Sequence, residues 1–327
     1  MLALLAALSL AGPDLDPESP RGLARVAILQ GPLEIAGAPQ APKVGDEVDA
    51  GAAISTPAGS RATIDFPDGS ELRISEKTEI VLESPRKVTL KKGKIYVKVV
   101  RGAARFELAS ENAPVFTEQG AVEIELVPKI PNEEPAHTYI KVLEGMALAT
   151  SKKFNAKVFA GFRVSAYGSQ LNTPDPMGNG SLQTAWVHPL LLERGRSDDE
   201  TQTRAMELVQ ELGRVTPNDP AEAALRTLGD LATAEIARFL NRTAGGPQPA
   251  RRAAGARIIA ETGSLKSAAA LVLLLQHSEP EIRVIASQGL ARLNGGKDLG
   301  FNEAYWKGES RDAGQKVWED WLKQHIK

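Results

Sequence analysis

The residues that could support acid–base or metal chemistry are few and scattered. The chain has no cysteine and four histidines, His137, His188, His277 and His325, which lie in four different segments. None of them has the histidine partner four positions away that a zinc-binding His-Glu-x-x-His helix requires. His137 and His188 lie beside polar or proline-containing sequence, so we interpret both as surface residues. We therefore expect no metal ion and no cofactor.

Two further patterns bear on hydrolytic chemistry. The Gly-x-Ser-x-Gly motif of α/β-hydrolases does not occur, and Gly178-Asn179-Gly180-Ser181 lacks the lysine of a phosphate loop, so we interpret it as flexible linker. Glu123 and Glu125 share the outer face of a predicted strand, which allows a glycosidase-like pair. Glycosidases place their carboxylates across a cleft, whereas these two acids would lie on a flat exposed strand. We interpret them as solvated surface residues and predict that the protein is not an enzyme.

The strongest electrostatic signal is a run of basic residues. Between positions 86 and 105 the chain has no Asp or Glu, and it carries Arg86, Lys87, Lys91, Lys92, Lys94, Lys98, Arg101 and Arg105. Lys94, Tyr96 and Lys98 should share one face of a strand. We interpret the run as a candidate anion-binding strip for lipid headgroups, wall polymers or acidic polysaccharide. The alternative is that lysines on exposed strands prevent edge-to-edge pairing.

The elements that carry this run have the alternating pattern of half-buried strands. Apolar and polar residues alternate between positions 60 and 100, and Asp68-Gly69 and Lys92-Gly93 interrupt the alternation. This pattern predicts strands joined by tight turns, with one face on a core and the other in water. Similar strands with glycine turns continue from about residue 25 to 167. Their spacing is typical of an all-β sandwich, barrel or solenoid.

Length and composition bound the class of protein. With 327 residues, two domains are expected, and 42% hydrophobic and 24% charged residues are ordinary for a globular chain. The net charge of −2 gives no reason to expect nucleic acid as a partner. No apolar run reaches the roughly 20 residues that a membrane-spanning helix needs, so we expect no transmembrane span.

Composition shifts divide the chain into five segments. Residues 1–11 are a short apolar run that predicts a secretory signal peptide, the alternative being an apolar N-terminus without a targeting role. Residues 12–20 are an acidic, proline-rich linker, residues 21–170 the β-domain, residues 171–197 a second linker, and residues 198–327 a helical domain. The signal peptide predicts a periplasmic or otherwise extracytoplasmic protein.

Four motifs follow one another through the β-domain. They are Val44-Gly45-Asp46, Ser60-x-Ala62-x-Ile64-x-Phe66-x-Asp68-Gly69, Val88-x-Leu90-x-x-Gly93-x-Ile95 and Val142-x-Glu144-Gly145. In this order they resemble the FecR domain, a β-domain of bacterial cell-envelope signalling proteins. The resemblance implies a FecR-like β-solenoid or β-sandwich and a role in envelope signalling. Gly120-Ala121-Val122 departs from the family's pattern, and only about 20 residues precede the domain, so we do not expect direct regulation of a sigma factor across the membrane.

From Asp198 onward the periodicity is helical. Three helices are expected to begin with proline in the first turn, at Pro220, Pro249 and Pro280, about 30 residues apart. The segment 278–286, with its Pro-x-Ile-Arg sequence, resembles the first helix of a HEAT repeat. We therefore expect a short α-solenoid of roughly three HEAT-like helix pairs.

Three tryptophans lie near the C-terminus of the chain. A helix starting near Asp312 would place Trp318 and Trp321 on one face, with Trp306 close by. We interpret them as a terminal cap that seals the core of the helical array. The alternative is a stacking platform for carbohydrate or peptide.

These patterns leave two classes of function open. The leading hypothesis is a non-enzymatic extracytoplasmic FecR-domain protein that senses, binds or scaffolds signalling in the envelope. Its helical repeats would bind a protein partner, and its basic strip an anionic polymer or lipid. The alternatives are a wall- or polysaccharide-binding protein, hydrolytic if a catalytic cleft exists, and a structural assembly module.

Overall fold

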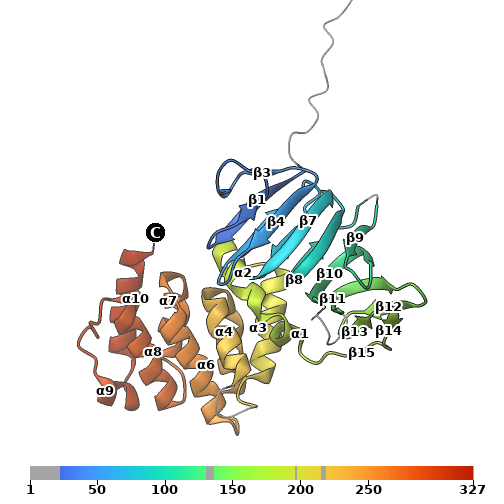
Figure 1. Cartoon of the computed structure of the whole chain (residues 1–327). Coiled ribbons are helices and arrows are strands. Elements are labelled where there is room, and N and C mark those ends of the chain that lie inside the picture. Colours follow the sequence, from blue (N-terminus) through green and yellow to red (C-terminus); the bar gives the residue numbers. More distant parts are fainter. Residues whose placement is uncertain (1–22, 103, 130–135, 196, 215–218, 327) are drawn as a thin grey trace, which may run out of the picture.

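A β-sheet forms the N-terminal part of the protein, and a stack of helices lies beside it (Figure 1). The computed structural model describes residues 23–102, 104–129, 136–195, 197–214 and 219–326. The expected division into a β-rich and a helical part is confirmed. The predicted signal peptide (1–11) and first linker (12–20) lie outside the described residues.

The strands alternate between buried and exposed positions, as the sequence pattern predicts. They are β1 (Ala24–Gln30), β2 (Glu34–Ile35), β3 (Glu47–Val48), β4 (Ala52–Thr56), β5 (Arg61–Asp65), β6 (Glu71–Ile74), β7 (Thr78–Ser84), β8 (Lys87–Val99), β9 (Phe106–Ala109), β10 (Val115–Val127), β11 (His137–Thr150), β12 (Asn155–Phe159), β13 (Phe162–Tyr167), β14 (Gln170–Leu171) and β15 (Asp175–Pro176).

These strands form one sheet that does not close on itself in the described part of the chain. Its main path runs β14-β13-β11-β10-β9-β8-β6-β5-β1-β3, and β7, β4 and β2 branch from β8. The first half of β8 pairs with β7 and, in parallel, with β9, whereas its second half pairs with β6 and β10. The solenoid or sandwich form that we expected is not confirmed.

The two predicted turns behave differently. Asp68-Gly69 closes the β5–β6 hairpin, where Ser70 donates its backbone N–H to the Asp68 carboxylate at 2.8 Å and Gly69 has φ +84°. Lys92-Gly93 lies inside β8, so the tight turn predicted there is wrong. A register shift against β7 falls at this point, and Gly93 has φ +87°. A Cβ at position 93 would lie 2.7 Å from the Lys77 carbonyl oxygen. The glycine therefore marks a bulge and not the end of a strand.

The helices begin within the segment that we expected to be a linker. They are α1 (Gly180–Gln183), η1 (Ala185–Val187), α2 (His188–Arg194), α3 (Asp199–Glu211), α4 (Pro220–Leu228), η2 (Gly229–Ala232), α5 (Thr233–Thr243), α6 (Pro249–Thr262), η3 (Leu265–Ser267), α7 (Ala268–Leu274), α8 (Pro280–Leu293), α9 (Glu303–Lys307) and α10 (Asp312–His325). The expected linker 171–197 thus contains α1, η1 and α2, and the buried Leu190 and Leu191 hold α2 in place. Within the described residues, no helix has the length and apolar character that a bilayer crossing needs.

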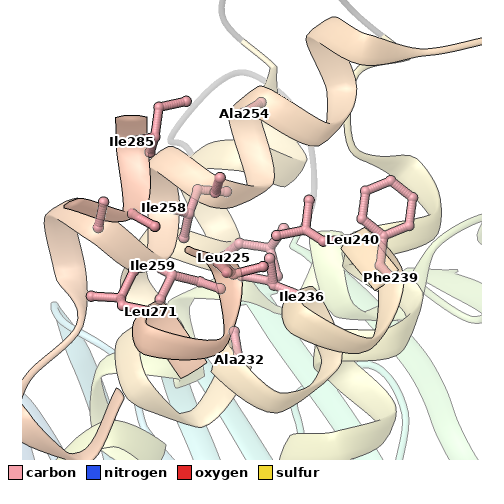
Figure 2. Close-up of a cluster of buried hydrophobic side chains, with 14 of the residues drawn as sticks. Leu225, Ala232, Ile236, Phe239, Leu240, Ala254, Ile258, Ile259, Leu271 and Ile285 are labelled. Carbon is pink, nitrogen blue, oxygen red and sulfur yellow. The ribbon is translucent and has the colours of Figure 1, made fainter. Parts of the chain in front are cut away.

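The helical stack has two rows of packed helices. One row contains α4, α6 and α8, each of which begins at its predicted proline, and the other contains α5, α7 and α10. Aliphatic side chains from both rows meet in one buried cluster, in which Leu225, Ile236, Leu240, Ile258 and Leu271 lie close together (Figure 2). Burial of this apolar area is the main force that holds the rows together.

A repeated arginine joins successive helix pairs. It occupies the fourth position of both α6 (Arg252) and α8 (Arg283), and only 2% of each residue is exposed. Arg252 donates to the Glu279 carboxylate at 2.6 Å and to a carbonyl of the preceding loop. Arg283 donates to the carbonyl oxygens of His277 and Trp306 at 2.8 and 2.7 Å. Each arginine therefore ties the loop before its own helix to the next unit of the stack.

The C-terminal tryptophans lie in the core. Trp306 and Trp318 have no exposed surface and Trp321 has 7%. The Trp318 and Trp321 rings meet edge to face at 5.4 Å, and Trp321 donates to the side chain of Asn294. Because these rings are covered, they offer no open face for stacking, which agrees with the interpretation as a cap.

Candidate functional site

Around Tyr96, the polar face of the sheet lies against helices and not against water. Tyr96 of β8, expected on a solvent-facing surface between Lys94 and Lys98, is 1% exposed. Helix α3 covers it, and α2 contacts β1 and β5 (Figure 1). The prediction of a water-facing outer face is therefore wrong in this region, because the helical part provides a second layer.

A buried carboxylate organises the contact between the sheet and α3. Glu200 lies in the first turn of α3 and is 3% exposed. Arg73 of β6 binds it with both terminal nitrogens, at 2.6 and 2.9 Å, and Arg204, one helical turn along, donates at 3.0 Å. The Tyr96 hydroxyl and the Lys98 ammonium group donate at 3.2 and 3.3 Å. We call these five residues the junction cluster.

The three cations of the junction cluster surround its single carboxylate and keep it ionised. Burial by itself would raise the pKa of Glu200, but Arg73, Arg204 and Lys98 hold that pKa well below its ordinary value. Burial, followed by the charge of Glu200, raises the pKa of Tyr96, so its hydroxyl remains a donor. The cluster is therefore a fixed ionic contact, and it contains no free acid or base for catalysis.

A second set of polar contacts extends the junction along α2. Arg194, the last residue of α2, forms an ion pair with Asp65 at 2.5 Å and another with Glu71. Glu71 also pairs with Arg73 at 2.9 Å, which links the two sets. Gln30 of β1 donates to the Pro189 carbonyl oxygen at 3.1 Å. The sheet and helices therefore share a continuous ionic contact.

Glu123 and Glu125, the candidate catalytic pair, both form ion pairs within the protein. Glu123 has no exposed surface, because it accepts from the indole N–H of Trp186 at 2.6 Å and pairs with Lys141 at 2.7 Å. Glu125 pairs with Lys94 at 3.1 Å. The interpretation of Glu123 as a solvated surface acid is wrong, since the segment around η1 covers it.

The basic run is mostly neutralised by acids from other strands. Five of its members form ion pairs with described carboxylates, namely Arg86 with Asp68, Lys87 with Glu83, Lys92 with Glu79, Lys94 with Glu125 and Lys98 with Glu200. The Arg105 guanidinium lies 3.9 Å from the Phe116 ring centre. Lys91 and Arg101 are exposed and pair with no described acid. The structure thus leaves at most three of the eight charges open to an anion.

The histidines do not come together in the structure. His188, expected at the surface, has no exposed surface, and its Nδ1 lies 3.3 Å from the Ala224 carbonyl oxygen. Burial, followed by the charge of Arg204, lowers its pKa to about 3. His277 is also buried, 3.4 Å from the Leu240 carbonyl oxygen. In the described part of the chain, no group of three His, Asp or Glu residues could hold a metal ion.

Among the hollows formed by the described residues, two lie on the helical stack and could bind a ligand. One, of about 970 Å³, lies along α6, α8 and α9, with Val284 and Ile285 in its floor and Arg257, Glu261 and Glu281 among its lining residues. The other, of about 370 Å³, lies between α3, α5 and α6. Sequence reasoning named neither, because their lining residues come from helices that meet only in the folded stack.

Comparison with solved structures found two crystal structures of a candidate anti-sigma factor from Parabacteroides distasonis ATCC 8503. They are 15% and 16% identical in sequence, with a TM-score of 0.36 for both, and each match covers 42% of this chain. The chain spans 64% of the length of those structures. A search among curated proteins found no match. Residues 52–148, from β4 through most of β11, match the family described as FecR protein.

Proposed function

We propose that this protein is a non-enzymatic signalling or regulatory component of the bacterial cell envelope. In this proposal, the FecR-like sheet senses or binds, and the helical stack binds a protein partner. The match of residues 52–148 to the FecR family carries the proposal. The ion pairs of the candidate catalytic acids support a binding role over hydrolysis, because Glu123 and Glu125 are already paired with Lys141 and Lys94.

The helical stack has features that suit protein recognition. Its helices recur about every 30 residues, each opening helix begins with proline, and a buried arginine joins consecutive units. We propose that these are HEAT-like helix pairs. The long hollow along α6 and α8 has an apolar floor and a charged rim, which is the composition of a typical protein interface.

The location and the anionic ligand are further parts of the proposal. The apolar run 1–11 supports export across the cytoplasmic membrane. If an envelope polymer or lipid binds the β-domain, Lys91, Arg101 and Arg105 are the members of the basic run available to it. Fractionation of the native bacterium, with detection of the protein by antibody, tests the location, and recovery only in the cytoplasm would contradict it.

Site-specific photo-cross-linking in the native bacterium tests the binding role. A photoreactive amino acid replaces Gln288 in the long hollow, Met206 in the smaller hollow, or Lys157 on β12 as a control. We expect a defined protein adduct from a hollow position and none from Lys157. Mass spectrometry would then identify the partner. Adducts made only with wall fragments would instead support the polysaccharide-binding alternative, and the absence of any adduct from both hollows would contradict the proposed helical interface.

A further inference from the structure

The smaller hollow between α3, α5 and α6 combines an apolar floor with an excess of arginine. We propose that it binds an acidic segment of a partner protein, with one apolar side chain on the floor and carboxylates against the arginines. This inference rests on the proposed protein-binding role of the helical stack. The partner expected at this hollow is a protein whose binding segment is acidic.

The floor of the hollow is formed by three apolar side chains. Val209 and Phe239 are each 4% exposed and belong to the core, whereas Met206 of α3 is 47% exposed and lines the same hollow. An exposed, unbranched methionine adapts its shape to a partner at little cost. A volume of about 370 Å³ suits one inserted side chain and its flanking groups better than a second folded domain.

Four arginines line the hollow, against a single lining carboxylate, Glu235. Arg238 pairs with Glu235 at 2.5 Å, and Arg214 pairs with Glu211, which lies outside the hollow, at 2.9 Å. Arg242 is exposed and makes no ion pair with a described residue. A positive field therefore remains over the floor.

The fourth arginine is held in place by the backbone. Arg251 donates to the carbonyl oxygens of Val209 and Gln210 at 2.6 and 2.7 Å, and its guanidinium lies 4.9 Å from the Phe239 ring centre. Its Nε is buried without a hydrogen-bond partner among the described atoms. Burial, followed by repulsion from Arg214, lowers the pKa of Arg251. An arriving carboxylate would offset this repulsion, since Arg251 forms no ion pair with a carboxylate in the part of the chain that the structure describes.

This arrangement favours a protein segment over a polyanion. Nucleic acid requires a continuous basic surface, but the chain has a net charge of −2 and the arginines converge on one apolar floor. Arginine is also the residue best suited to bidentate binding of carboxylates. The expected ligand is therefore a short peptide with a leucine or similar side chain between acids.

The test measures binding of a fluorescein-labelled peptide, Gly-Glu-Asp-Leu-Asp-Glu-Gly, to the full chain by fluorescence anisotropy. We expect saturable binding in low salt that weakens at least about tenfold in the Arg238→Glu, Arg242→Glu double variant. Replacing the peptide's leucine by glycine should also weaken binding several-fold. Arg25→Glu is the control, because Arg25 is an exposed arginine of β1 that lines neither hollow, and it should leave binding unchanged.

Four outcomes would overturn the inference. They are no saturable binding, equal binding by the double variant and the wild-type chain, equal binding of the leucine and glycine peptides, and tighter binding after deletion of residues 1–22. The last would assign the hollow to the chain's own acidic segment 12–20. If the peptide fails but Gln288 still cross-links to a protein in the native host, this inference fails and the proposed function stands. Circular dichroism of each variant verifies that it is folded.

Discussion

The junction cluster and the smaller hollow both gather arginines on α3 and its neighbours, yet their chemistry differs. At the junction, Arg73 and Arg204 surround the buried carboxylate of Glu200. At the hollow, no described carboxylate pairs with Arg242 or Arg251, and a methionine lies exposed between the helices. The carboxylate of the first site comes from the chain itself, whereas two arginines of the second site pair with no described carboxylate. This difference separates a contact that holds the fold together from a surface that could receive a partner.

The largest expected effect is the loss of the junction carboxylate. Glu200→Ala leaves the buried guanidinium of Arg204 without its carboxylate and that of Arg73 with Glu71 alone, so we expect a loss of roughly 3–5 kcal/mol in the free energy of unfolding. Urea denaturation measures this loss. Glu235→Ala at the hollow is the control and should change stability by less than about 1 kcal/mol, because its partner Arg238 is exposed. Equal effects of the two substitutions would remove the distinction between the sites.

Acid should weaken the protein first through His188, which packs beside the junction. Its pKa is lowered to about 3, below the value of 6.5 in the unfolded chain, so the unfolded state binds the proton first as the pH falls. Stability is fully present above pH 6.5 and decreases toward pH 3, by about 2 kcal/mol at pH 5. In urea titrations between pH 7 and 5, the free energy of unfolding of His188→Gln should fall less steeply with decreasing pH than that of the original protein. An unchanged slope would contradict the assignment to His188.

The lysine at the rim of the junction should matter less than its arginines. The Lys98 side chain is 28% exposed and lies 3.3 Å from Glu200, so Lys98→Met should cost about 1 kcal/mol. Lys94→Met on the same strand is the matched control, since it breaks only the more exposed pair with Glu125. The comparison uses midpoints of urea denaturation at low and high salt. A larger loss of unfolding free energy for Lys94→Met than for Lys98→Met would contradict the expected contribution of Lys98 to the junction.

The smallest effect is expected at the hollow. Arg242→Ala removes an exposed charge that pairs with no described acid, so stability should stay within about 0.5 kcal/mol of the original. The same urea experiment measures it beside Arg204→Ala, which should be strongly destabilising. A loss above 1 kcal/mol in the free energy of unfolding for Arg242→Ala would show that this arginine has a structural role. The hollow would then resemble the junction and would not be a surface free to receive a partner.

Features that depend on neighbouring residues could be predicted from the sequence. Asp68-Gly69 forms its hairpin, and α4, α6 and α8 begin at the expected prolines, because turn and helix-start preferences are local. The coarse order of a β-rich part and a helical part followed from the change in hydrophobic period. The tight turn predicted at Lys92-Gly93 is wrong, because a glycine within an alternating pattern is compatible with a bulge as well as with a turn.

Features that depend on the meeting of distant segments could not be predicted. Arg73 and Glu200 are 127 positions apart, and Trp186 covers Glu123 across 63 positions. A local alternation identifies two faces of a strand, but it cannot show that a later helix covers the polar face. One signal was present in hindsight, since Tyr96 interrupts a row of lysines with a large ring. On α3, Glu200, Arg204 and Leu208 recur every four residues, which places two charges on the buried stripe.

Helix α3 carries both sites, with Glu200 and Arg204 toward the sheet and Met206 and Val209 toward the hollow. Its 13 residues make a rod about 20 Å long. Because both sites share this rod, a partner that prefers a displaced α3 must also change the strength of the sheet contact. Thermodynamic reciprocity requires the converse, so a ligand that shifts the sheet against α3 would change the affinity of the hollow by the same factor.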